Sequence, residues 1–188
     1  DERGAPVKPY FLPYGSIVFP TESGDNGAER IEIAAPDKIR RWVQRDDLTD
    51  VVDPAEETTA DLQESIILSA VQFLGVPYLW GGRSPMGFDC SGLVQIIYGM
   101  HGINLPRDSA EQRLVGREVS RGQLAPGDLI YSPGHVVIYM EADRFIHASL
   151  GEGGVEINSY DPHDENYRED LDRDFAVARR VVGETLSD

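Results

Sequence analysis

Gly87-Phe88-Asp89-Cys90-Ser91-Gly92 contains the only cysteine of this chain and directly precedes an apolar pattern with helical spacing. A single cysteine cannot form an internal disulfide, and its acidic and small neighbours are typical of a loop-to-helix junction rather than of a packed core. The free N–H groups at a helix N-terminus favour a thiolate and can also stabilise an oxyanion. We therefore interpret Cys90 as a nucleophile at the start of a helix.

Helical spacing is found on both sides of this stretch. Thr58, followed three residues later by Asp61, has the form of a capping box, and the apolar residues after it predict a helix that ends before Gly75 and Pro77. The pattern from Cys90 predicts a second helix as far as residue 101. Residues 108–111 predict a short third helix, and residues 78–87 a glycine-rich loop.

The chain changes to a β pattern after residue 116. Five apolar or alternating stretches, separated mostly by short turns, predict antiparallel strands at 128–131, 135–140, 144–147, 155–158 and 175–178. Alternation also predicts short strands at 30–34 and 41–43. Helices followed by strands indicate an α+β fold, with helices packed on an antiparallel sheet.

Two histidines are candidates for the base that a cysteine nucleophile needs. If residues 141–143 form a three-residue hairpin loop, Met140 pairs with Arg144 and Val137 with His147. His135 and His147 then become diagonal neighbours on one face, which suits a base and its orienting partner. A two-residue loop would instead place them on opposite faces.

Metal binding is the other use that a cysteine and two histidines allow. A metal site would have to use Cys90, His135 and His147, but no CxxC or HExxH spacing supports it, so we expect no metal and no cofactor. His101, at the end of the second helix, is interpreted as structural, and His163 as exposed in an acidic loop.

Charge and hydropathy limit the classes of molecule that the chain is expected to bind. The net charge of −16 argues against nucleic acid and anionic membranes. No run of about 18 apolar residues predicts a membrane span. The first residues lack the apolar stretch of a signal peptide, which fits either a cytoplasmic protein or an envelope or secreted protein whose signal was removed. We expect a monomer.

Six short strings, taken in order, resemble the NlpC family of bacterial cell-wall cysteine peptidases, which have a papain-like fold. The likeness covers roughly residues 60–182 and is carried by Tyr78-Leu79-Trp80-Gly81-Gly82, Phe88-Asp89-Cys90-Ser91-Gly92-Leu93-Val94, Leu105-Pro106-Arg107-Asp108-Ser109, Pro126-Gly127-Asp128-Leu129, Gly134-His135-Val136 and Ile146-His147-Ala148.

The resemblance implies Cys90 as nucleophile, His135 as general base, His147 as the orienting third member and Tyr78 as a helper of the oxyanion hole. It also implies hydrolysis of the γ-D-glutamyl-L-diamino acid bond in peptidoglycan stem peptides. Residues 1–50 resemble, less specifically, a bacterial SH3-like β-barrel that is incomplete at its start. On this basis we expect an SH3-like domain at 1–50, a linker at 51–58 and the peptidase domain at 59–188.

One subgroup of the family binds the free amino group of an N-terminal L-alanine with an acid before the nucleophile and a tyrosine of the SH3-like domain. In this sequence Asp89 matches the acid, and Ser91, Trp80 and Arg107 occupy matching positions. Tyr14 is taken as the tyrosine, with Tyr10 as the other candidate. This implies short, freed peptides as substrates.

Three alternatives stay open from the sequence. An N-acetylmuramoyl-L-alanine amidase or a thiol acyltransferase would use the same nucleophile layout. A non-catalytic wall-binding module has no need of Cys90, His135 and His147 together.

Overall fold

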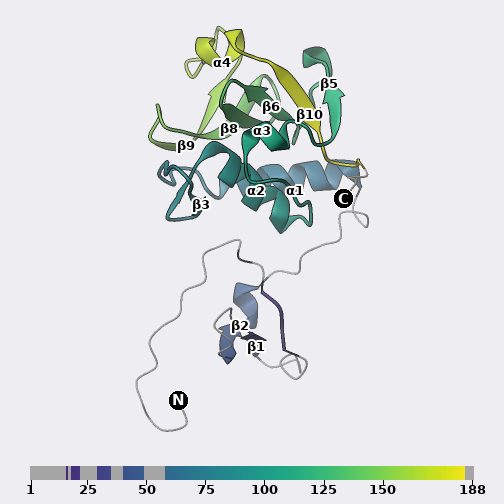
Figure 1. Ribbon diagram of the computed structural model, residues 1–188, viewed down its shortest axis with the longest axis vertical. Helices are drawn as coiled ribbons and strands as arrows, with labels where there is room; N and C mark the ends of the chain where they lie inside the picture. Colours follow the sequence, from purple (N-terminus) through teal and green to yellow (C-terminus); the bar gives the residue numbers. More distant parts are fainter. Residues whose placement is uncertain (1–15, 17, 22–28, 35–39, 49–57, 185–188) are drawn as a thin grey trace.

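The computed structural model of the chain describes residues 16, 18–21, 29–34, 40–48 and 58–184 (Figure 1). Residues 1–14, with Tyr10 and Tyr14, and most of the expected linker lie outside them, so neither tyrosine is placed. No helix among the described residues is long and apolar enough to cross a bilayer.

The described part before residue 49 contains a two-stranded antiparallel sheet. Strand β1 (Arg30–Ala34) pairs with β2 (Arg40–Gln44), and a short 3-10 helix (Arg45–Asp47) follows. Strand β1 is the one that alternation predicts, with Ile31 and Ile33 buried, and β2 is the second expected short strand, longer by one residue at each end.

A six-stranded antiparallel sheet dominates the rest, in the order β5-β10-β6-β7-β8-β9. Its strands are β5 (Arg117–Val119), β6 (Leu129–Ser132), β7 (His135–Tyr139), β8 (Arg144–Ser149), β9 (Gly154–Ser159) and β10 (Val177–Arg180). The last expected strand therefore begins two residues later than predicted, and the short strand β5 was not predicted.

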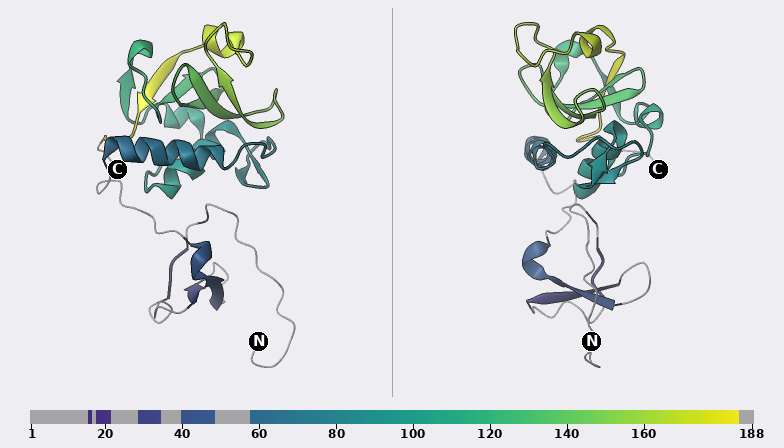
Figure 2. Two further views of the ribbon diagram at one scale, coloured as in Figure 1. Left: turned by 180° about the vertical axis from the view of Figure 1, so that it is seen from behind. Right: turned by 90° about the vertical axis from the view of Figure 1, so that its left-hand side faces the viewer.

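Two helices cover one face of this sheet, and a short one lies on the other side (Figures 1 and 2). Helices α1 (Thr59–Val71) and α2 (Cys90–Met100) enclose a large apolar cluster with the sheet. The opposite face packs Val137 and Phe145 against Leu171 of α4 (Glu169–Arg173), a helix that the acidic sequence did not reveal. The α+β fold with helices on an antiparallel sheet is confirmed.

The caps and turns form largely as predicted. Thr58 accepts a hydrogen bond from the Asp61 N–H at 3.2 Å and so starts α1. Gly75 has φ of +78° and its N–H donates to the Val155 carbonyl, which ties the end of α1 to β9. Helix α3 (Ser109–Gln112) is the expected short one, and a further 3-10 turn spans Arg121–Gln123.

The glycine-rich segment, expected as a loop, contains regular secondary structure. It contains the small hairpin of β3 (Arg83–Ser84) and β4 (Gly87–Phe88), which packs on the first turn of α2. A Cβ on Gly92 would lie 2.1 Å from the Gly82 carbonyl oxygen, so glycine at position 92 is what allows the hairpin and the helix to meet. This contact fixes the backbone around Cys90.

Candidate active site

Cys90 is the first residue of α2 and is 8% exposed. Asp89 has extended backbone angles at the N-cap, and its Oδ1 accepts a hydrogen bond from the Gly92 N–H at 2.7 Å. The N–H of Val136 donates to the thiol, so the sulfur lies against the start of β7, one residue from His135. The helix and the sheet thus bring together the cysteine and the histidine that the sequence paired.

Burial dominates the electrostatics of the thiol. It raises the pKa of Cys90, and the charge of Asp89 raises it further, while the N–H groups of Val136, Ser91 and Cys90 lower it only in part. The helix N-terminus by itself therefore does not leave a thiolate here. The resting cysteine keeps its proton, and a base must remove it.

His135 and His147 lie as the three-residue hairpin loop predicts. Strands β7 and β8 pair Ile138 with Ile146 and Tyr139 with Phe145, a register that places Val137 opposite His147. His135 Nε2 and His147 Nδ1 are 2.6 Å apart, and the two rings meet edge to face with centroids separated by 4.9 Å. The second histidine is positioned to orient the first.

Asn158 on β9 completes this series of hydrogen bonds, and no motif in the sequence points to it. Its Oδ1 lies 2.7 Å from His147 Nε2. The β8–β9 register places Phe145 opposite Asn158 and His147 opposite Glu156, so His147 and Asn158 are diagonal neighbours on one face. In the sequence, Asn158 stands out only as a lone amide in an apolar strand. Its position next to His147 depends on the β8–β9 register, which no sequence motif gives.

The chain of hydrogen bonds fixes the tautomers. Because the Asn158 Oδ1 can only accept, His147 carries its proton on Nε2 and accepts at Nδ1. His135 must then donate from Nε2, which leaves its Nδ1 without a proton. An imidazole in this tautomer has the free nitrogen that a general base requires.

Both imidazoles are held neutral. Burial lowers the pKa of His135 to about 4, and the charge of Arg168 lowers it further while Asp170 opposes it. Burial also lowers the pKa of His147 to about 3, although its hydrogen bond to Asn158 acts in the other direction. At neutral pH both imidazoles are therefore neutral, and the Cys90 thiol is protonated.

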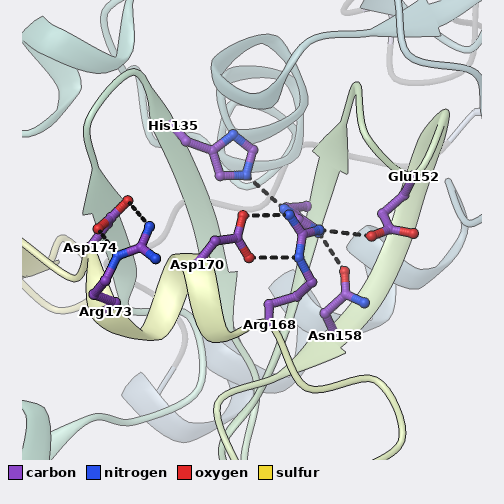
Figure 3. A network of polar contacts seen from close by, with 8 residues as sticks. His135, Glu152, Asn158, Arg168, Asp170, Arg173 and Asp174 are labelled. Atoms are coloured by element: carbon purple, nitrogen blue, oxygen red, sulfur yellow. Dashed lines mark hydrogen bonds and ion pairs between the residues drawn. The ribbon is translucent and has the colours of Figure 1, made fainter.

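Two charged groups act on this pair in opposite directions: Arg168 lowers the pKa of both histidines and Asp170 raises it (Figure 3). The Arg168 guanidinium forms two hydrogen bonds with Asp170, at 2.9 and 2.8 Å, and one with Glu152 at 2.9 Å. The backbone N–H of Arg168 donates to the carbonyl of Ser159, the residue after Asn158. The residue thus fastens the segment before α4 to the end of β9.

Asp89, Ser91 and Arg107 form a compact cluster at the start of α2. Arg107 donates to both carboxylate oxygens of Asp89, at 3.0 and 2.5 Å, and to the Ser91 hydroxyl at 2.9 Å. The Gly81 N–H donates to the same carboxylate at 2.9 Å. Burial alone would raise the pKa of Asp89, but these donors outweigh it and lower the pKa, so the carboxylate is ionised.

Tyr78 and Trp80 differ in how closely they join the site. Tyr78 is half-buried; burial raises the pKa of its hydroxyl, and so do Cys90 and Asp89, which places the phenol close to the thiol. Trp80 is 86% exposed, on the loop whose Gly81 N–H reaches Asp89. Its ring is available at the surface rather than packed.

The remaining histidines are placed as expected. His101 ends α2 and is hydrogen-bonded to Ser69 of α1 at 2.9 Å, a structural contact, and His163 is exposed. In the part of the chain that the structure describes, no group of three or more His, Cys, Asp or Glu side chains could hold a metal ion.

A cysteine at a helix N-terminus, packed against the start of a strand that carries one histidine of a hydrogen-bonded pair, is the arrangement of a papain-like cysteine peptidase. The profile of the NlpC/P60 family matches residues 75–171, and the chain belongs to this family. The matched segment contains every described candidate, from Tyr78 to Asn158, and also Arg168.

Relatives of known structure and function share this region. A solved NlpC/P60 family protein of Bacillus cereus superposes with a TM-score of 0.71 at 29% identity, over 88% of this chain and 53% of that one. Dipeptidyl-peptidase 6 of Lysinibacillus sphaericus is 38% identical over 58% of this chain and 41% of its own length. The gamma-D-glutamyl-L-lysine dipeptidyl-peptidase of B. cereus is 35% identical over 66% of this chain and 40% of its own. The chain thus spans less than half of these two curated relatives.

Proposed function

We propose that this chain is a cysteine peptidase that hydrolyses the γ-D-glutamyl-L-diamino acid bond of peptidoglycan stem peptides. The observation that carries the proposal is the directional chain Asn158–His147–His135, which presents an unprotonated Nδ1 on the residue beside Cys90. The substrate class is supported by the family membership and by the similarity to a gamma-D-glutamyl-L-lysine dipeptidyl-peptidase of B. cereus.

The reaction is an acyl transfer in two stages. His135 Nδ1 takes the thiol proton, and the Cys90 sulfur attacks the γ-carbonyl carbon of D-glutamate. The oxyanion that forms is stabilised by the Cys90 N–H and by the Tyr78 hydroxyl. Protonated His135 donates its proton to the nitrogen of the leaving diamino acid as the C–N bond breaks. Water, deprotonated by the same imidazole, then hydrolyses the thioester.

The two partners of His135 act through orientation. Asn158 holds the His147 ring, and His147 holds the reactive tautomer of His135, much as the third residue of a triad holds its histidine. His147 is 1% exposed, so this hydrogen bond is not shared with bulk water.

We also propose that Asp89 binds the free amino group of an N-terminal L-alanine. Its carboxylate is ionised beside the nucleophile, and Arg107 and Ser91 fix its position. Trp80, exposed on the adjoining loop, would form a wall of this subsite. Tyr14 of the N-terminal region is the proposed second ligand of the ammonium. Short peptides would then be preferred over intact wall, where that amine is blocked.

The domain arrangement is part of the proposal. Residues 1–50 would form an SH3-like β-barrel, 51–58 the linker and 59–188 the peptidase domain. The β1–β2 pair supports a small β domain. The likeness to the B. cereus structure extends over 88% of the chain, well beyond the segment matched by the family profile.

The test uses the purified chain with L-Ala-γ-D-Glu-diaminopimelate, its lysine counterpart, and intact sacculi, with products identified by mass spectrometry. We expect release of the free diamino acid from the tripeptides. Cys90→Ala should abolish it, and because Cys90 is the sole thiol, a thioester adduct can only be on this residue. An amidase would leave the stem peptide whole, and a wall-binding module would bind sacculi and release nothing.

N-acetylated L-Ala substrates test the amine subsite separately. The acetyl group removes the positive charge, so we expect a loss of roughly tenfold or more in kcat/KM, and a smaller loss in Asp89→Asn, which cannot form the ion pair. Equal turnover of the free and acetylated peptides would disprove the amine requirement and leave the peptidase activity standing.

A further inference from the structure

The backbone that leads to Arg107 has no regular secondary structure over residues 103–106. Such a segment lacks the ladder of backbone hydrogen bonds that fixes a helix or a strand, so other donors have to hold it. Gln112 of α3 supplies one of them, because its side-chain amide donates to the Pro106 carbonyl at 2.9 Å. The residue directly before Arg107 is therefore held by a side chain.

The same amide also holds the start of α2. Gln112 Nε2 donates to the Ser91 carbonyl at 3.0 Å, so one nitrogen binds both the residue after Cys90 and the residue before Arg107. Since both partners are carbonyl oxygens, which only accept, the amide must turn its nitrogen toward them. One side chain thus sets the spacing between the two stretches of backbone that carry the Asp89–Arg107 cluster.

The burial of Gln112 shows that packing alone does not account for an amide at this position. The residue is 0% exposed, and its Oε1 is buried without a hydrogen-bond partner. A buried acceptor without a partner costs free energy, which an apolar side chain of similar size would avoid. What the amide contributes is the pair of hydrogen bonds to the Ser91 and Pro106 carbonyls.

A second glutamine holds the same segment with a single hydrogen bond. Gln95 of α2 is half-buried, and its Nε2 donates to the Leu105 carbonyl at 2.8 Å. The carbonyls of residues 105 and 106 are therefore both bound by side-chain amides, which come from two different helices. The backbone before Arg107 cannot shift without breaking at least one of these hydrogen bonds.

We propose that Gln112 is a positioning residue of the amine subsite, assisted by Gln95. The inference rests on the proposed function, in which Asp89 binds the amino end of the substrate. Arg107 donates to both carboxylate oxygens of Asp89, so a displaced guanidinium would turn the carboxylate away from the direction in which it meets the ammonium. By fixing the Arg107 backbone against the first turn of α2, Gln112 sets that direction without contacting the substrate.

The experiment compares Gln112→Met and Gln95→Met with the parent chain on L-Ala-γ-D-Glu-diaminopimelate and on the same peptide with its amine acetylated. The measured quantity is the ratio of kcat/KM for the free peptide to kcat/KM for the acetylated one. A loss of folded enzyme lowers both values equally, so a merely structural role leaves this ratio unchanged. Gln72→Met is the matched control, because Gln72 is exposed and its amide donates to the Leu68 carbonyl at the end of α1, outside the cluster.

In Gln112→Met we expect the ratio to fall roughly threefold to tenfold, chiefly through a higher KM for the free peptide, with a smaller fall in Gln95→Met and none in Gln72→Met. An unchanged ratio in Gln112→Met, or an equal fall in the control, would overturn the positioning role and leave the amine subsite in place. If Gln112→Met did not fold, Gln95→Met would decide by the same criterion. A parent chain that cleaved both peptides equally would remove the amine subsite and this inference with it, and one that cleaved neither would remove the proposed function itself.

Discussion

The Asp89–Arg107 cluster beside α2 and the His135–His147–Asn158 chain on the sheet hold the same site together in opposite ways. The first is a charged pair whose carboxylate also accepts from the Gly81 and Gly92 N–H groups. The second contains no charge, since burial keeps both imidazoles neutral. In the proposed function the charged pair would bind the amino end of the substrate, and the neutral hydrogen bonds would fix which nitrogen takes the thiol proton.

This division has an electrostatic consequence for the nucleophile. The ionised Asp89 raises the pKa of Cys90, so the cluster that we assign to substrate binding works against thiolate formation. A substrate ammonium placed on Asp89 would neutralise that charge and remove the opposition. If Asp89 binds the substrate as we propose, substrate binding and activation of Cys90 are coupled through this one carboxylate.

Replacing the general base should abolish the contribution of the His135–His147–Asn158 chain to catalysis. His135→Gln keeps a polar side chain of similar length but cannot accept and return the thiol proton, and we expect kcat to fall by roughly 10³-fold or more. Single-turnover release of the diamino acid measures it. Retention of more than a tenth of the activity would mean that another group deprotonates Cys90.

Removing the far end of the hydrogen-bonded chain should have a smaller effect. Asn158→Ala leaves His147 free to take the other tautomer, so the proton on His135 is no longer fixed, and we expect kcat to fall by roughly 10- to 100-fold with little change in KM. Ring nitrogen NMR shifts report the tautomers directly. Unchanged shifts together with lowered activity would assign Asn158 a packing role instead.

In the Asp89–Arg107 cluster the main expected effect of a substitution is on the free energy of unfolding. Asp89→Asn keeps an acceptor for the Gly92 N–H but leaves Arg107, whose side chain is 29% exposed, without its carboxylate. We expect a loss of about 1–3 kcal/mol at pH 7, measured by urea unfolding. Because the pKa of Asp89 is lowered in the folded state, this contribution is present above pH 4 and disappears as the pH falls through the folded value. The variant and the parent chain should therefore converge in stability in acid.

The smallest expected effect concerns the charge that acts on the histidines. Arg168 lowers the pKa of both, so Arg168→Gln should raise the pKa of His135 from its value of about 4. The base must be neutral to act, so the acid limb of kcat/KM should move to higher pH, by less than one unit, with little change at pH 7. Arg173→Gln is the matched control, since Arg173 pairs only with its neighbour Asp174 in the network of Figure 3. A shift in the control of equal size would attribute the effect to net charge.

Much of the fold followed from local patterns. The cap at Thr58 and the stop at Gly75 act over a few residues, so they can be inferred without knowing the rest of the chain. The strands of the central sheet were predicted for the same reason. Strand β5, helix α4 and the β3–β4 hairpin were missed, because each is short and is stabilised by the partner it packs against rather than by its own pattern.

The sequence by itself was enough to predict a cysteine at the start of a helix, the histidine pair and the hairpin register that joins the pair, because a lone cysteine before a helix and a three-residue loop are local features. Only the tertiary structure placed Asn158 behind His147 and brought the Arg168–Asp170 pair near both histidines. These depend on strand order and on burial, which arise from contacts between distant segments. The protonation of Cys90 was decided there too, since burial outweighed the helix N-terminus.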